Sequence, residues 1–79
     1  MARFRYVDIA TGRRGEGKTT WQAMIDALGP KLADETLDRM DRQEAWRPLA
    51  EVSSKGDYEI AEIMDGEGEL VGSVTKIRD

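Results

Sequence analysis

The segment from Gly12 to Thr19 has residue types and a spacing that suggest a specific chemistry. Its residues, Gly-Arg-Arg-Gly-Glu-Gly-Lys-Thr, match the pattern G-x-x-x-x-G-K-[ST], and Gly15 adds a third glycine. The residues that follow favour a helix, because Thr19 to Gln22 have the spacing of a capping box and an apolar face recurs at helical intervals in Trp21, Met24, Ile25 and Leu28. A strand, a glycine loop and a helix are the local context in which such a segment can hold a phosphate.

This pattern resembles the Walker A motif of P-loop NTPases. The resemblance implies that backbone N–H groups of the glycine loop, at Gly12, Gly15 and Gly17, surround the phosphates of a nucleotide. It implies further that Lys18 contacts the β and γ oxygens and that Thr19 ligates Mg²⁺.

The rest of the chain departs from the pattern of that family. A P-loop strand is buried on both faces and therefore continuously apolar, whereas residues 3–9 interleave charges with apolar residues. The chain has 79 residues, and each βαβ unit takes about 30, so at most two such units fit. A Walker B candidate at residues 60–65 is interrupted by Glu62. We therefore interpret residues 12–19 as a solvated basic turn before a capped helix, with phosphate binding as the alternative.

Composition limits the kinds of function that the chain can have. At 79 residues we expect one domain, residues 1–79, of a size that is only marginally able to bury its own core. Cysteine and histidine are absent, which excludes disulfides, zinc sites built from these residues and His-based catalysis. No apolar run has the length of a membrane span, and we expect a cytoplasmic protein that is not an enzyme and has no cofactor or metal site.

Charge is distributed unevenly along the chain. The net charge of −4 argues against general nucleic-acid binding. The first quarter is nevertheless basic, and a nucleic-acid contact through these residues is a further alternative: Arg3, Arg5, Arg13, Arg14 and Lys18. The last third is acidic, and it offers a second surface that could bind a partner.

Periodicity and turn residues predict an α+β domain with the order β-α-α-β-β-β and two helices on one face of an antiparallel sheet. We expect a strand over residues 3–10, a helix from Thr20 to Leu28 ended by Gly29-Pro30, and a second helix from about residue 30 or 34 to Trp46, limited by Pro48. Three strands are expected to follow, over residues 49–53, 58–64 and 69–77.

The same patterns predict which residues are buried together. One core is expected to contain Val7, Ile9, Leu28, Leu37, Met40, Ile63, Leu70 and Val74. In the last hairpin, Ile63 is predicted to pair near Leu70, which would put Ala61, Ile63, Leu70 and Val74 on one face. The opposite face would remain partly apolar and uncovered, because two helices can cover only one side of a small sheet.

The interpretation that fits these observations best is a non-catalytic protein-binding domain. Its predicted partner-binding residues combine apolar anchors with carboxylates: Tyr58, Ile60, Glu62, Met64, Glu67, Glu69 and Val71. In size and composition the chain resembles small acidic inhibitors of phages and mobile elements, including anti-CRISPR proteins. The expected partner is another protein, with a nucleic-acid-handling enzyme as one candidate. Self-association through the same face is an alternative, and neither a membrane nor direct nucleic-acid contact is expected.

Overall fold

The computed structural model describes residues 3–39, 42–65 and 67–77 and forms an α+β domain. Two strands come first, β1 (Arg3–Asp8) and β2 (Arg14–Gly17). Three helices follow, α1 (Thr20–Leu28), α2 (Pro30–Arg39) and α3 (Arg42–Val52). The chain then returns to the sheet as β3 (Ile60–Met64) and β4 (Leu70–Ile77).

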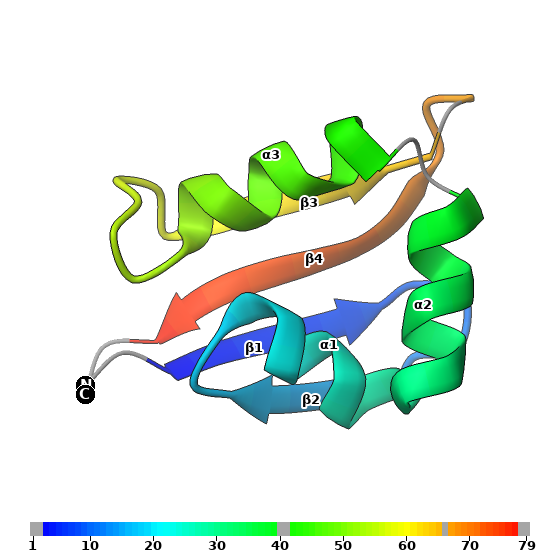
Figure 1. The fold of residues 1–79 in the computed structure, drawn as a ribbon, viewed down its shortest axis with the longest axis horizontal. Helices are drawn as coiled ribbons and strands as arrows, with labels where there is room; N and C mark the ends of the chain where they lie inside the picture. The colour runs from blue at the N-terminus through cyan, green and yellow to red at the C-terminus, as the bar shows by residue number, and fades with distance from the viewer. Residues whose placement is uncertain (1–2, 40–41, 66, 78–79) are drawn as a thin grey trace.

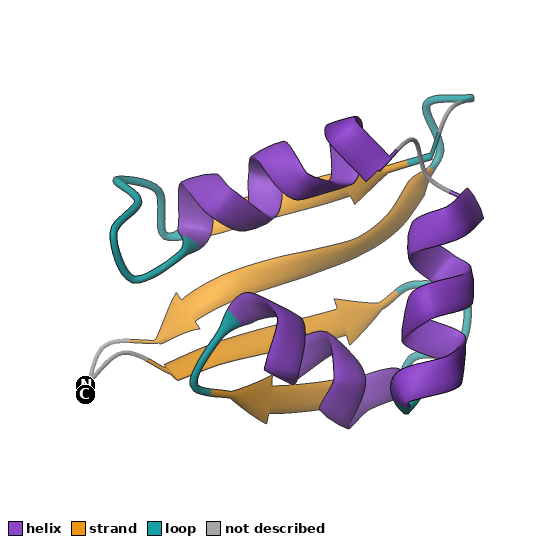
Figure 2. Ribbon diagram, viewed as in Figure 1, coloured by secondary structure: helices purple, strands orange, loops and turns teal. Residues whose placement is uncertain are grey.

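The four strands form one antiparallel sheet in the order β2-β1-β4-β3. The first and last strands of the chain, β1 and β4, therefore lie side by side in the middle, and β2 and β3 form the two edges (Figure 1). The helices lie on one side of this sheet (Figure 2), where α1 packs on β1 and β2 and α3 packs on β3 and β4. The opposite face has no helix over it among the described residues.

The core lies between the sheet and the helices, and it includes the face of β1 that carries Phe4 and Tyr6. Our prediction placed Val7 and Ile9 in the core, and this was wrong. Val7 lies half-buried on the opposite face, and Ile9 follows the strand with 51% of its surface exposed. Because side chains alternate along a strand, only one of the two sets can face the helices, and the packing places the larger aromatic pair there.

Asp8 also lies on the helix side of β1 and is buried, and both oxygens of its carboxylate accept hydrogen bonds. Its Oδ1 accepts a hydrogen bond from the Tyr6 hydroxyl at 3.1 Å. Its Oδ2 accepts hydrogen bonds from the hydroxyl and the amide of Thr11, at 2.7 and 3.0 Å. These bonds offset the cost of burying the carboxylate, and they also hold the turn that leads from β1 to β2.

Two parts of the predicted element order differ from the structure. Residues 14–17 form a strand that we did not predict, and residues 49–52, predicted as a strand, belong to α3. In α3, Leu49 and Val52 are three residues apart and both buried, which is the spacing of a helix face packed on a core. Pro48 lies inside this helix rather than ending it, so tertiary packing outweighs the local penalty of proline.

The segment predicted as one helix after Gly29 is divided into α2 and α3. In its first part, the predicted core residue Leu37 is buried as expected, and Ala33, one turn earlier, is buried as well. The predicted core residue Met40 lies outside the described residues. Leu28, which ends α1, is buried as predicted, and α1 has the predicted bounds.

The hairpin of β3 and β4 forms as predicted, but its register differs by two residues from the predicted pairing of Ile63 with Leu70. Ala61 lies opposite Val74 and Ile63 lies opposite Gly72, and Ile63 and Val74 are buried in the core as predicted. Leu70 was predicted to be buried on the same face, but 39% of its surface is exposed. The register shifts between Ile63 and Met64, which sets Leu70 opposite Met64. A bulge of this kind moves every residue beyond it to the other face, and the sequence pattern did not reveal it.

Candidate functional site

The free edge of β3 has backbone groups that the sheet does not use. In an antiparallel pair, every second residue bonds to the neighbouring strand and the residues between point away from it. The Lys76 amide donates to the carbonyl of Glu59 at 2.6 Å, which sets this alternation. Ala61 and Ile63 therefore bond to β4, whereas Ile60 and Glu62 direct their N–H and C=O groups away from it, at the edge where the described sheet ends.

A groove of about 550 Å³ lies between this edge and α3. The described residues that line it come from α3, from β3 and from the segments on either side of β3: Arg47, Pro48, Glu51, Tyr58, Ile60, Ala61, Glu62, Met64, Asp65 and Gly68. Three of its apolar side chains are unusually exposed, since Tyr58, Ile60 and Met64 present 59%, 62% and 42% of their surface. We call this feature the β3–α3 groove. Apolar side chains gathered beside an open strand edge are typical of an interaction surface.

The wall formed by α3 is attached to β3 by backbone contacts. The amide of Tyr58 donates to the carbonyl of Glu51 at 3.2 Å, just before β3 begins. Gly56 passes so close to the end of α3 that a Cβ at this position would overlap the carbonyl of Glu51. Lys76 of β4 donates from Nζ to the Gly56 carbonyl at 2.8 Å. These contacts join the segment between α3 and β3 to both α3 and β4, and so they fix the position of α3 relative to β3.

Acidic side chains dominate the charge of the groove. Among its described lining residues, Glu51, Glu62 and Asp65 are acidic and Arg47 is basic. Glu67 and Glu69, in the turn that follows β3, are exposed as well. A surface of this charge favours a partner segment that carries lysine or arginine.

The structure brings together four of the seven predicted partner-binding residues, Tyr58, Ile60, Glu62 and Met64, as walls of the groove. Glu67 and Glu69 lie in the adjoining turn, and Val71 is half-buried against the core. The prediction missed the α3 wall, Arg47, Pro48 and Glu51, because residues 49–53 were taken for a strand. The helical spacing of Leu49 and Val52 was the signal that could have revealed it.

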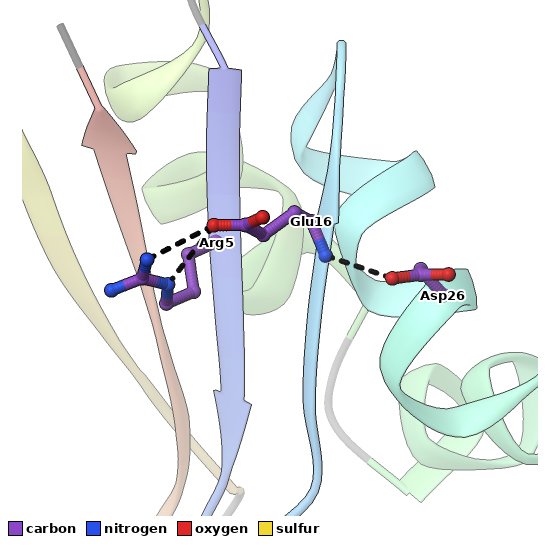
Figure 3. A network of polar contacts seen from close by, with 3 residues as sticks. All are labelled: Arg5, Glu16 and Asp26. Carbon is purple, nitrogen blue, oxygen red and sulfur yellow. Dashed lines mark hydrogen bonds and ion pairs between the residues drawn. The ribbon is translucent and has the colours of Figure 1, made fainter.

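Within the Gly12–Thr19 segment, residues 14–17 form the opposite edge of the sheet, and there one outward amide is bonded. Residues 14–17 pair with β1 from Val7–Arg14 to Phe4–Gly17, which turns the amide of Glu16 outward. This amide donates to Oδ2 of Asp26 in α1 at 3.0 Å (Figure 3). The side chain of Glu16 points the other way and pairs with Arg5, whose Nη2 lies 3.0 Å from Oε1 (Figure 3).

Gly15 and Gly17 allow α1 to lie close to β2. A Cβ on Gly15 would overlap the backbone of Ala23 and Ala27, and one on Gly17 would lie 2.8 Å from the amide of Ala23. Of the three glycines in the motif, only Gly12 has a positive φ, of 71°. Two glycines of the motif are thus explained by helix packing.

The arrangement that a Walker A loop needs is not formed by these residues. A phosphate loop turns successive N–H groups toward one point, whereas successive N–H groups of a strand such as β2 point to opposite sides. Thr19 caps α1, because its Oγ1 accepts from the Gln22 amide at 3.0 Å. The Lys18 amide donates to the Gln22 side chain at 3.2 Å. The predicted capping residues are therefore confirmed as a helix start.

The basic residues of the first quarter do not gather at one point. Arg3 and Arg5 lie on the helix-free face of β1, and Arg5 pairs with Glu16. Arg13 and Lys18 lie just before and just after β2, at its two ends. Arg14 lies on the helix-free face of β2, opposite Val7. A nucleic-acid contact through all five would have to extend along both β1 and β2.

Within the described ranges, no helix has the length and apolar character needed to cross a membrane. In the same part of the chain no group of acidic side chains is arranged to hold a metal ion. Comparisons with protein-family models, with curated proteins and with solved structures found no match to this chain. The function must therefore be argued from the site itself.

Proposed function

We propose that this chain is a non-catalytic protein-binding domain and that its binding site is the β3–α3 groove. One observation carries the proposal, namely that an open strand edge coincides with three exposed large apolar side chains, Tyr58, Ile60 and Met64. Each feature alone is a liability for a soluble domain, because both promote association with other chains. Their coincidence in one groove is best explained by a partner that covers both.

The composition of the groove supports this proposal. Binding surfaces on proteins combine an apolar centre with a polar rim, and aromatic residues and methionine are enriched in the centre. Tyr58, Ile60 and Met64 supply such a centre, and Glu51 and Glu62 supply the rim. The apolar anchors would add to the affinity, while the carboxylates would raise the rate of association with a basic surface.

We further propose that binding blocks the partner, as in the small acidic inhibitors that the chain resembles in size and composition. A domain with a Cα radius of gyration of 11.2 Å is large enough to cover a binding channel once it is held at its edge. Steric blocking needs only a stable contact, so no chemical step is required of the chain.

A matched set of variants tests the proposal. Immobilised wild-type protein, Ile60→Glu and Arg14→Ala would be exposed to an extract of the cells that encode the chain. Ile60 is exposed on the edge strand β3, and Arg14 is exposed on the opposite edge strand β2. Each variant should therefore keep the fold. A protein retained by wild type and by Arg14→Ala but lost with Ile60→Glu would support the groove as the site. Retention by all three, or loss with Arg14→Ala alone, would contradict it.

A further inference from the structure

We propose that the partner enters the β3–α3 groove as an extended basic segment that adds a fifth strand to the sheet, at the edge of β3. This inference rests on the proposed function and specifies how the partner is recognised. It assigns affinity to main-chain hydrogen bonds and selectivity to side chains, as in other cases of strand addition.

The backbone of β3 supplies the main-chain part of the contact. Ile60 and Glu62 each direct one N–H and one C=O away from β4, as the alternation set by the Glu59–Lys76 bond requires. An added strand would satisfy these groups in turn. Since β3 has five residues, a segment of about the same length, roughly 3.3 Å per residue, would cover it.

The side chains of the added strand would alternate between two environments. Those opposite Ile60 and Glu62 would share with them the helix-free face, where apolar residues can pack on the exposed side chain of Ile60. Those between would face α3, where the carboxylate of Glu51 lines the groove, so lysine or arginine suits these positions. The chemistry of the groove therefore selects a segment in which apolar and basic residues alternate.

Charge complementarity distinguishes this partner from a second copy of the chain. Two copies joined at β3 would bring two sets of acidic side chains together, Glu51, Glu62 and Asp65 from each, against one described arginine of the groove from each, Arg47. Like charges placed opposite one another across strands are destabilising. A basic segment meets the same carboxylates with opposite charge.

The test uses a peptide of four Val-Lys repeats, acetylated and amidated at its ends, added to the full chain labelled with ¹⁵N. Strand addition predicts that the amides of Ile60 and Glu62 become protected from hydrogen exchange. At a peptide concentration about ten times its Kd, their exchange should slow about tenfold, because the bonds are open in only about a tenth of the molecules. The amides of Ala61 and Ile63 already bond to β4 and should change little.

Two control peptides separate the contributions. A peptide of Val-Glu repeats has the same backbone with the opposite charge and should not bind. The Val-Lys peptide with every amide nitrogen methylated retains its charge but cannot donate hydrogen bonds, and should bind at least about tenfold more weakly.

Variants of the chain test the same point from the other side. In Ile60→Pro the lost N–H is the one that points away from β4, so the strand pairing should survive, as for other edge prolines, while the peptide is no longer bound. Ile60→Ala loses the same side chain but retains that N–H, so it is the matched control: it should bind the peptide more weakly than wild type and more tightly than Ile60→Pro. Glu51→Gln should weaken binding of the Val-Lys peptide about two- to fivefold and reduce its salt dependence.

The outcomes separate this inference from the proposed function. If the peptide shifts the resonances of Tyr58 and Met64 but the amides of Ile60 and Glu62 gain no protection, and Ile60→Pro or the methylated peptide binds normally, strand addition is wrong and the groove remains the site. If the peptide and the captured partner perturb only residues outside the groove, both proposals fail. A concentration-dependent dimer that Ile60→Pro abolishes, with no peptide binding, would identify a second copy as the occupant and overturn the inference.

Discussion

The two edge strands of this sheet, β2 and β3, differ in how their outward backbone groups are covered. At β2 the outward amide of Glu16 is bonded to Asp26, and α1 lies so close that Gly15 and Gly17 have no room for a Cβ. At β3 the outward groups of Ile60 and Glu62 face a groove with exposed apolar walls. Natural sheets usually protect their edges against pairing with other chains. The contrast supports the proposal that β3 is the edge that receives a partner.

The largest effect is expected from Gly15→Ala, which breaks the closed edge. The added Cβ would overlap the backbone of Ala23 and Ala27, and neither can yield as a flexible side chain would. We expect a cost above the roughly 1–3 kcal/mol of ordinary overpacking, a large part of the roughly 5–15 kcal/mol that stabilises a small domain. Thermal and urea unfolding would measure it. Gly17→Ala should cost less, and equal stability of Gly15→Ala and wild type would contradict the packing of α1.

The second prediction separates the two faces of the open edge strand. Ile63 is fully buried beneath α3, so Ile63→Ala should lower the free energy of unfolding by about 2–5 kcal/mol. Ile60 is 62% exposed, and Ile60→Ala should change the free energy of unfolding by less than about 0.5 kcal/mol. Urea unfolding of both variants provides the comparison. Similar losses for the two would show that β3 lies in a different register.

A third, smaller effect is expected when the closed edge is opened by Asp26→Ala. The bond from the Glu16 amide to Asp26 is exposed, so we expect a loss of about 0.5–1.5 kcal/mol, or several degrees in Tm. Hydrogen exchange at the Glu16 amide should become faster in this variant. The stability of Asp26→Asn should lie between those of wild type and Asp26→Ala, because the side-chain oxygen of asparagine can still accept this hydrogen bond. An unchanged exchange rate at Glu16 would mean that Asp26 does not protect this edge.

The smallest effect is expected from Lys18→Ala, which sharpens the contrast within the glycine segment. Lys18 is exposed, and its backbone amide, which contacts Gln22, remains in the variant. We expect a change in stability within about 0.5 kcal/mol and no rise in Tm when MgATP is added to the wild type. A bound nucleotide at 100 times its Kd would instead add about 2.7 kcal/mol. A Tm increase that Lys18→Ala removes would restore the phosphate-binding alternative.

Features encoded within a few neighbouring residues could be predicted from the sequence. The bounds of α1 follow from Thr19 as its cap and from Gly29, which has a φ of 84° and bonds back to the Ile25 carbonyl. The face shared by Ala61, Ile63 and Val74 follows from the alternation of apolar residues, whereas the register of the hairpin, which pairs Ile63 with Gly72, does not. Tyr58, Ile60, Glu62 and Met64 were assigned to one surface on the same basis, and all four line the groove.

Other features depend on segments that are distant in the sequence, and local patterns could not reveal them. The apolar residues of β1 alternate in a way that permits either face to be buried, and the helices decide in favour of Phe4 and Tyr6. The glycines of β2 have the spacing of a phosphate loop, and only the position of α1 shows that they form a strand beneath a helix. Pro48 suggests a helix end, yet the burial of Leu49 and Val52 continues α3 past it.

The sequence by itself thus determined the α+β class, the start and end of α1 and the pairing of β3 with β4, because caps, turns and side-chain alternation act between neighbouring residues. Only the tertiary structure decided which strands lie at the edges and which edge is closed. At β2, the Asp26 side chain of α1 bonds the outward amide of Glu16. At β3, the outward N–H and C=O groups of Ile60 and Glu62 face the groove beside α3. Both are contacts between elements, and their energies arise only after the chain has packed.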